Sequence, residues 1–423
     1  MESKRRSTLL KNKSYLWLIS SQIVSSLGDW LDILAVMTLV AIKWNASPIA
    51  VSALMLCFAG PMIVVGPIAG SIADKFDRKK IMIISDILSA IAVLGVAFST
   101  SLWQVYVLIT LKSIFVAFFM PAKNGKLKEI VDPEDIQMAT GISGMIDNGA
   151  KVIGPTISGL LVASVGVQWA FFLDAISFVL SALFLIAVPK TAIQSTNDIT
   201  ATSKLSLQEL SSTMKEGFAI LKGFPILLTS LFLFSASLFV LQIADTQFMV
   251  LARLIFEEPT TLVGYAMAAS GVGMFVSSAI LTKIKLPNVL VTTSLGGIGV
   301  GGAFALVALM TRLDITLIYL LFPLLCFIAG ASFGLTAIPF QISVQKQVPI
   351  SKTGRVFGTI GSITTISSFI GMGLGGVLSQ TIGVIQTFVL AGVLLICVGT
   401  LMLISKRSVE SRGHHVTESD GGI

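Results

Sequence analysis

Charged side chains are scarce in this chain of 423 residues: only 12% are Asp, Glu, Lys or Arg, whereas soluble domains carry about 25%. Hydrophobic residues make up 54% of the sequence. A water-soluble fold cannot bury so many apolar side chains, so the composition excludes a soluble globular protein and predicts a polytopic membrane protein. The apolar runs are continuous over about 20 residues or more, which excludes a β-barrel and leaves helices.

Cysteine and histidine are almost missing. The three cysteines, Cys57, Cys326 and Cys397, all lie in apolar segments, where they are typical of packing residues and not of a disulfide framework or a metal site. A Gly-x4-Gly-Lys-Ser/Thr loop is absent, which disfavours ATP-driven transport by this chain alone. No nucleophile–base arrangement is recognisable. We therefore expect a protein that is not an enzyme and that needs no cofactor and no metal.

Long apolar segments dominate what is present, and twelve of them can cross a bilayer as helices. Their approximate bounds are 15–42, 48–72, 81–99, 102–122, 137–163, 168–188, 224–252, 261–282, 288–310, 315–343, 354–379 and 385–405. The sequence thus predicts an all-α membrane protein with 12 transmembrane helices.

A polar stretch, 189–223, divides the twelve segments into two sets of six. We expect an N-terminal tail over 1–13, a six-helix bundle over 14–188, a linker over 189–223, a second bundle over 224–405 and a C-terminal tail over 406–423. Within the linker, apolar residues recur at helical spacing and predict an amphipathic surface helix: Leu207, Leu210, Met214, Phe218 and Leu221.

Basic residues are distributed unevenly between the two sides. The 29 Lys and Arg residues lie mostly in the tails and in the loops of one side, whereas the opposite side has only Lys43, Arg253 and Arg312. The positive-inside rule places both termini in the cytoplasm and the helices in the cell (plasma or inner) membrane. The net charge of +7 is therefore a topology signal, with contact to membrane lipid as a secondary consequence, and no sign of nucleic acid binding.

An internal repeat relates the two halves at a constant offset of 217 residues: Gly141, Gly144, Gly154, Gly159 and Gly166 recur as Gly358, Gly361, Gly371, Gly376 and Gly383. The repeat predicts two pseudo-symmetric six-helix bundles, with a site near the membrane midplane and transport by rocking of one half against the other. The alternative is that glycine-rich membrane helices merely look alike.

A short charged turn, Gly70–Lys80, separates the second and third segments. Asp74 ends the second segment and can accept hydrogen bonds from amides at the N-terminus of a helix in the other half, a contact of about 0.3–1 kcal/mol or more. The alternative is a solvated turn that only sets topology. Asp86, in the third segment, is expected to complement the basic residues of this turn.

Ionisable residues in the middle of the first bundle cost at least about 2.5–3.5 kcal/mol each; they are Asp29, Asp32, Lys112, Asp147 and Lys151. Asp147 and Lys151 are four residues apart and can pair. Two neutralising pairs would leave one carboxylate unmatched, and such a group can exchange a proton. We predict Asp29 or Asp32 as the proton carrier, with Asp147 third; the alternative is a static network that fixes helix packing.

A polar stripe continues Asp29 and Asp32 along the first segment and should face a central cavity. Asp174, near the outer end of the sixth segment, is expected to be structural. The candidates for substrate contact are Gln22 of the stripe, Trp30, Gln242 and Asp245.

Two motifs resemble the major facilitator superfamily. The charged turn is similar to the family's loop between helices 2 and 3, with Asp77 in place of its second glycine and with matches at Gly70, Asp74, Lys75, Arg78 and Lys79. The fifth segment is similar to the family's exporter motif, with Ala150 and Ser158 replacing two glycines and with matches at Gly141, Gly154, Pro155 and Gly159.

Three further stretches, Leu27–Trp30, Phe172–Phe178 and Gly354–Gly358, resemble the macrolide-efflux and siderophore-exporter branch, whereas Lys112 stands where many antiporters of the family have Arg. The resemblance covers residues 14–405 and implies the major facilitator fold. It also implies that Asp74 latches the outward-facing state.

By this resemblance the chain is a secondary exporter, acting as a proton antiporter on amphipathic small molecules such as drugs, macrolides or siderophores, and working as a monomer. Two alternatives stay open: a proton-coupled symporter that imports a small nutrient, and a non-transporting sensor on the same scaffold.

Overall fold

The computed structural model describes residues 9, 11–132, 134–189, 218–256, 259–283, 289–310, 315–348 and 350–419. These residues form helices and no strands, which confirms the all-helical prediction. Most of the N-terminal tail and most of the proposed linker, including Leu207, Leu210 and Met214, lie outside the described residues.

The first six predicted segments are all helical. The helices are α2 (Lys13–Met37), which continues as the π-helix η1 (Thr38–Lys43), α3 (Pro48–Lys75), α4 (Arg78–Ala97), α5 (Leu102–Ile130), α6 (Ile136–Val165) and α7 (Val167–Ala187). The helix α5 runs about two turns beyond the predicted end at residue 122 and encloses Pro121. Because of this extension, three lysines that lie beyond the predicted segment are part of the helix: Lys123, Lys126 and Lys128.

The second six segments are helical as well. They form α9 (Pro225–Asp245), α10 (Phe248–Ile255), α11 (Pro259–Lys283), α12 (Val289–Leu309), α13 (Ile315–Gln347), α14 (Ile350–Thr381) and α15 (Val384–Ser419). The seventh predicted segment is interrupted after α9, so that α10 is a separate short helix. In the described residues, eleven helices are long and apolar enough to cross a membrane; α6 has the length, at 30 residues, but carries more polar residues and glycine.

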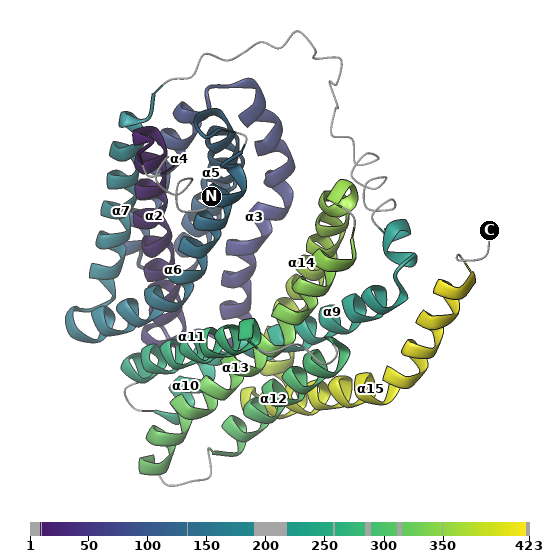
Figure 1. Cartoon of the computed structure of the whole chain (residues 1–423). Helices are drawn as coiled ribbons and strands as arrows, with labels where there is room; N and C mark the ends of the chain where they lie inside the picture. The colour runs from purple at the N-terminus through teal and green to yellow at the C-terminus, as the bar shows by residue number, and fades with distance from the viewer. Residues whose placement is uncertain are drawn as a thin grey trace. The chain divides into compact units, whose positions relative to one another are not determined.

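The chain divides into two compact units (Figure 1): the first comprises Met1–Asn45 and Ala53–Leu205, the second Ala46–Ser52 and Ser206–Ile423. In the first unit α2 packs on α6 and α7, and α4 packs on α5 and α7. In the second unit α9 packs on α14 and α15, and α12 packs on α13 and α15. Each of these pairings has its counterpart six segments later, as the internal repeat predicts.

Gly166 and Gly383 are a pair of repeated glycines whose presence has a physical reason. They are separated by the repeat offset, and their φ angles are both positive, at 95° and 96°. Each directly precedes a helix, at the short junctions of α6 with α7 and of α14 with α15. Because L side chains rarely adopt this backbone conformation, glycine is required at both junctions.

Apolar side chains fill both units. A cluster in the first unit includes Tyr15, Met82, Phe119, Leu127 and Leu185. In the second unit, Phe234 and Phe340 stack with ring centroids 4.9 Å apart inside the corresponding cluster. These clusters hold the helices that carry the site.

We predict that Gly166→Ala and Gly383→Ala each destabilise the protein by about 1–3 kcal/mol, because alanine at a positive φ is strained. The control is Gly302→Ala, since an added Cβ at this glycine of α12 meets open space. Thermal unfolding of the purified protein in detergent measures the difference. Unchanged unfolding temperatures for both junction variants would contradict this account.

Candidate functional site

The first unit contains a cluster of three carboxylates around a single lysine. Lys112 Nζ lies 2.8 Å from Asp32 Oδ2, 3.0 Å from Asp29 Oδ1 and 3.4 Å from Asp174 Oδ2. The side chains of Asp32 and Asp174 are completely buried and that of Lys112 is 4% exposed, whereas Asp29 is 32% exposed. Asp29 is therefore the one carboxylate of the cluster that is partly exposed at the surface of the first unit.

Three helices supply the cluster: α2 carries Asp29 and Asp32, α5 carries Lys112 and α7 carries Asp174. Residues three apart lie on the same face of a helix, so both α2 carboxylates turn toward α5 and α7. Gly28 permits the approach of α7, because a Cβ there would collide with the side chains of Asp174 and Ser177. The ammonium of Lys112 also lies 5.2 Å from the centre of the Phe178 ring, a distance suited to a cation–π contact.

The cluster is short of hydrogen-bond donors as well as of positive charge. Ser177 Oγ donates to the carbonyl oxygen of Asp174 at 2.8 Å and to its Oδ1 at 3.2 Å. Among the described residues, Asp32 Oδ1 is buried without a hydrogen-bond partner. One ammonium thus serves three carboxylates, and one buried carboxylate oxygen is left without a donor.

Asp174 is the member that the sequence interpretation missed. It was expected to be structural, near the outer end of its helix, yet its Oδ2 contacts Lys112. The available signal was that Asp174 and Gly28 both fall in stretches that resemble the same transporter branch. Asp86 also differs from expectation, because it is buried and accepts a hydrogen bond from Ser181 Oγ at 2.6 Å on α7.

A second polar group surrounds Asp147 on α6. Its Oδ1 accepts hydrogen bonds from Gln22 Nε2 at 2.8 Å and from Ser26 Oγ at 3.0 Å, both on α2. Lys123 Nζ lies 4.0 Å from its Oδ2. The predicted partner, Lys151, has a side chain outside the described residues, so the pairing of Asp147 with Lys151 stays a prediction.

Gln22 is held between helices. Its Nε2 donates to Ser143 O at 3.0 Å as well as to Asp147, and its Oε1 accepts from Ser143 Oγ at 2.8 Å. Lys123 Nζ in turn donates to Ser143 Oγ at 3.4 Å. Gln22 and Asp32 are therefore buried in contacts with neighbouring helices of the first unit, whereas the sequence reading expected their stripe to face a cavity.

The remaining substrate-contact candidates are Trp30 on α2 of the first unit and Gln242 and Asp245 on α9 of the second unit. Trp30 is half-buried, and a Cβ at Gly154 of α6 would collide with its Cβ. In the second unit, Gln242 is half-buried on α9, and Asp245 is exposed at the end of the same helix. A narrow crevice of about 10 Å³, which is room for about one water molecule, opens elsewhere in this unit.

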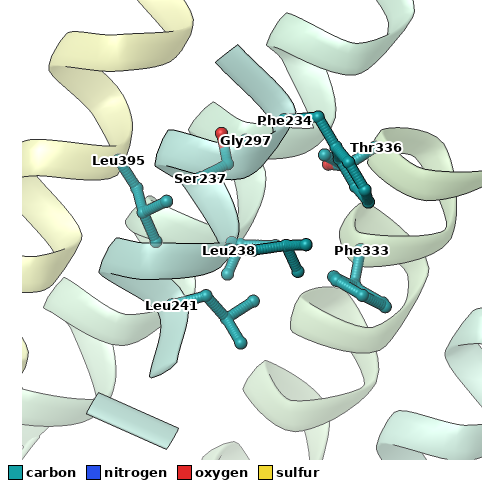
Figure 2. Close-up of a pocket in the computed structure, with 9 residues that line it drawn as sticks. Phe234, Ser237, Leu238, Leu241, Gly297, Phe333, Thr336 and Leu395 are labelled. Atoms are coloured by element: carbon teal, nitrogen blue, oxygen red, sulfur yellow. The ribbon is translucent and has the colours of Figure 1, made fainter. Parts of the chain in front are cut away.

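Figure 2 shows the crevice, which is almost wholly apolar and has two hydroxyl groups on its wall. It is lined by Phe234, Ser237, Leu238, Leu241, Gly297, Val300, Phe333, Thr336 and Leu395. These residues come from α9, α12, α13 and α15. The crevice is too small for a drug-sized molecule in this conformation.

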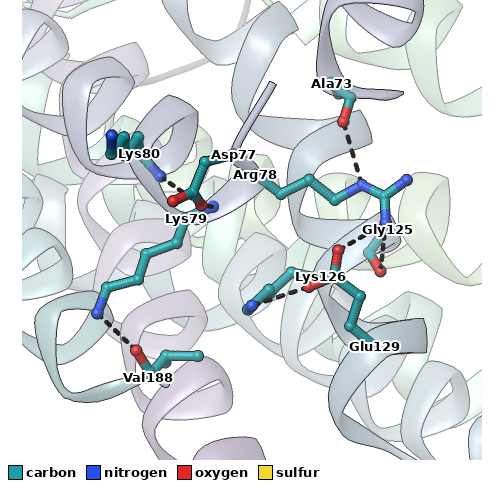
Figure 3. Close-up of polar contacts among 9 residues, drawn as sticks. All are labelled: Ala73, Asp77, Arg78, Lys79, Lys80, Gly125, Lys126, Glu129 and Val188. Carbon is teal, nitrogen blue, oxygen red and sulfur yellow. Dashed lines mark hydrogen bonds and ion pairs between the residues drawn. The ribbon is translucent and has the colours of Figure 1, made fainter. Parts of the chain in front are cut away.

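Residues of the charged turn form hydrogen bonds and ion pairs that connect α4 to α5 and α7 (Figure 3). Asp77, which replaces a glycine of the family motif, caps α4 by accepting from the amides of Lys79 at 3.0 Å and Lys80 at 3.4 Å. Arg78 donates to Ala73 O at 3.1 Å and to Glu129 Oε1 at 2.8 Å. The side chain of Asp74 lies outside the described residues, and an added Cβ at Gly70 meets open space.

Lys79 caps the C-terminal end of α7, because its Nζ donates to Ile186 O at 2.7 Å and to Val188 O at 2.6 Å. A lysine at this position is favourable because the last carbonyls of a helix lack partners and carry partial negative charge. The turn thus joins the cytoplasm-facing ends predicted for α4, α5 and α7 into one polar assembly.

The exporter motif brings α6 against α2. Gly154 and Gly159 are buried, and Ser158, which replaces a glycine, donates from Oγ to Leu31 O at 2.9 Å. Gly141 faces open space, and the side chain of Pro155 lies outside the described residues. In the part of the chain that the structure describes, no group of His, Cys, Asp and Glu is arranged to hold a metal ion.

Residues 18–372 match the sequence model of the Major Facilitator Superfamily. The chain is 44% identical over 415 residues to the uncharacterised MFS-type transporter YfiS of Bacillus subtilis (strain 168), covering 97% of each chain. It is 24% identical over 353 residues to macrolide efflux protein A of Streptococcus pyogenes, covering 80% of this chain and 82% of that one.

A solved structure of the peptide transporter POT in complex with sulfate has a similar fold. Its TM-score is 0.67 at 13% identity, with 94% of this chain and 95% of that chain covered. Likeness at this identity concerns the fold alone.

We predict that Lys112→Met destabilises the protein by about 3–5 kcal/mol, because it leaves buried carboxylates without their counter-charge. Adding Asp32→Asn to this variant should recover part of the loss, since the double variant removes one charge of each sign. Lys80→Met, at an exposed position, is the control and should change little. Thermal unfolding in detergent measures the stability of these variants. Equal stability of Lys112→Met and Lys80→Met would contradict the prediction.

Proposed function

Because the chain belongs to the Major Facilitator Superfamily, we propose that it is a secondary active exporter, which moves amphipathic small molecules outward in exchange for protons. The observation that carries this proposal is the buried cluster of Asp29, Asp32 and Asp174 around Lys112. Ionisable groups inside a membrane are costly and mark ion pathways. An excess of carboxylates over lysine gives this site a capacity to take up protons.

Asp29 is the exchange point in this mechanism, because its carboxylate is partly exposed, whereas those of Asp32 and Asp174 are fully buried. Protonation of Asp29 removes its attraction to Lys112 and so changes the balance of contacts that hold α2 against α5. Release of the proton restores the contact. Alternation between these two states couples proton flow to the rocking of one half against the other.

Export as the direction is supported by two observations. The small residues of the exporter motif let α6 pack closely on α2 at Gly154 and Ser158. The relative from Streptococcus pyogenes is named as a macrolide efflux protein. The proton gradient supplies enough energy, about 1.4 kcal/mol per pH unit and about 2.3 kcal/mol per 100 mV for each proton.

The proposed setting is the plasma membrane, with both termini in the cytoplasm and a monomer as the working unit. Gln242 and Asp245 of the second unit stay candidates for substrate contact.

We predict that this protein lowers macrolide susceptibility in a host without its own drug pumps. In proteoliposomes, radiolabelled erythromycin should move against an opposing proton gradient. Asp29→Asn should abolish this dependence on the gradient, whereas Asp132→Asn, the same change at an exposed position between α5 and α6, should preserve it. Transport indifferent to the gradient would overturn proton antiport, and net uptake by right-side-out vesicles would indicate the importing symporter instead.

We also predict that Asp74→Asn impairs transport without reducing the amount of protein inserted in the membrane, because it weakens the proposed latch on a helix N-terminus. Asp77→Asn is the matched control, since asparagine caps a helix as well as aspartate does and the cap of α4 is retained. Transport rates normalised to membrane protein measure the difference. Full transport by Asp74→Asn would reduce the turn to a topology signal.

A further inference from the structure

The two fully buried carboxylates of the cluster, Asp32 and Asp174, compete for one ammonium. Lys112 lies 2.8 Å from Asp32 Oδ2 and 3.4 Å from Asp174 Oδ2, and neither carboxylate is exposed to solvent. A single lysine neutralises a single carboxylate. If both were ionised, the site would hold an uncompensated charge in the apolar interior, where each such charge costs at least about 2.5–3.5 kcal/mol.

Two carboxylates that share a site cannot both ionise readily, because their charges repel each other at short range. Asp29 adds less to this repulsion, since its side chain is 32% exposed and so is less desolvated than the buried pair. The buried pair is therefore electrically balanced when Lys112 is charged and one proton is shared by Asp32 and Asp174.

The hydrogen bonds lead to the same conclusion independently. Asp32 Oδ1 is buried without a donor among the described residues, and an unsatisfied buried acceptor is costly. Ser177 supplies a donor to Asp174 Oδ1, and Lys112 already supplies one to Asp32 Oδ2. A proton held on the pair removes the charge excess, and an oxygen without a donor costs less on a neutral carboxyl group than on an ionised one.

We infer that Asp174 is a further proton-holding residue, which shares with Asp32 a proton additional to the one exchanged at Asp29. The inference rests on the proposed proton antiport and deepens it to two protons for each exported molecule. Both protons bind to carboxylate oxygens from one side and leave from the same oxygens to the other side. Lys112 stays an ammonium throughout, and no other bond forms or breaks.

Among the described residues, the charged groups around this pair come from the helices α2, α5 and α7 and, at greater distance, from α4. Asp29 and Asp32 lie on α2, Lys112 on α5 and Asp174 on α7, and Asp86 of α4 interacts electrostatically with Asp29. Asp174 reaches the lysine because Gly28 lets α7 approach α2. The role of Asp174 thus depends on a close helix contact that a bulkier residue would prevent.

Infrared difference spectroscopy of the purified protein tests the inference without any substrate. At neutral pH the wild type should show the C=O stretch of a protonated carboxylic acid, and Asp174→Asn should remove one component of that band. Asp86→Asn is the matched control, because Asp86 is also a buried aspartate with a serine partner on α7, and it should leave this component in place.

Ser177→Ala provides a second variant in case Asp174→Asn does not fold. It keeps the Asp174 carboxyl but removes its hydroxyl donor, so the frequency of the same component should shift. A wild-type spectrum without protonated carboxylic acid, or one unaffected by both substitutions, would overturn the inference.

Stoichiometry provides the functional readout. With the membrane potential clamped at zero and a gradient of one pH unit, two coupled protons sustain a substrate ratio of about 100-fold and one proton about 10-fold. For erythromycin, the wild type should reach the higher value and Asp174→Asn the lower. If the wild type reaches a substrate ratio of only about 10-fold, the inference of a second proton is wrong but proton antiport stands. If the substrate ratio does not depend on the pH gradient, the proposed proton antiport is wrong.

Discussion

The first unit depends on one lysine that holds three carboxylates inside an apolar bundle. Lys112 joins α2, α5 and α7 through contacts of 2.8–3.4 Å. Charges in such surroundings are tolerated only when each has a partner, so the positions of these helices and the charge state of the cluster constrain each other. A site that must stay close to neutral is one whose helix contacts respond to the arrival or loss of a proton.

The two units share a plan and differ in chemistry. The four pairings of α2 with α6 and α7 and of α4 with α5 and α7 recur in the second unit, and Gly166 and Gly383 precede equivalent helices with the same backbone conformation. The first unit, however, contains the buried lysine and carboxylates, whereas the described crevice of the second is apolar and has only the hydroxyls of Ser237 and Thr336. The duplicated scaffold therefore does not carry duplicated chemistry, because the buried charges of the first unit have no counterpart among the residues that line this crevice.

Several elements could be predicted from sequence because hydropathy and local rules decide them. All twelve apolar segments are helical, and the repeat of glycines corresponds to a repeat of helix pairings. The sequence predicts that the fourth segment ends at residue 122, because charged residues such as Lys123 and Lys126 favour a loop, whereas α5 continues to Ile130. In the structure both are buried in a continuing helix, where Glu129 and Ser143 supply their polar contacts.

The sequence by itself determined that this chain is a polytopic helical membrane protein of the major facilitator type, because the cost of moving each side chain from water into lipid depends mainly on that side chain and its near neighbours. Only the tertiary structure decided which charges meet. Asp174 joins Lys112, and Asp147 takes its hydrogen bonds from Gln22 and Ser26, because these contacts depend on which faces of distant helices pack together. No spacing along the chain encodes that choice.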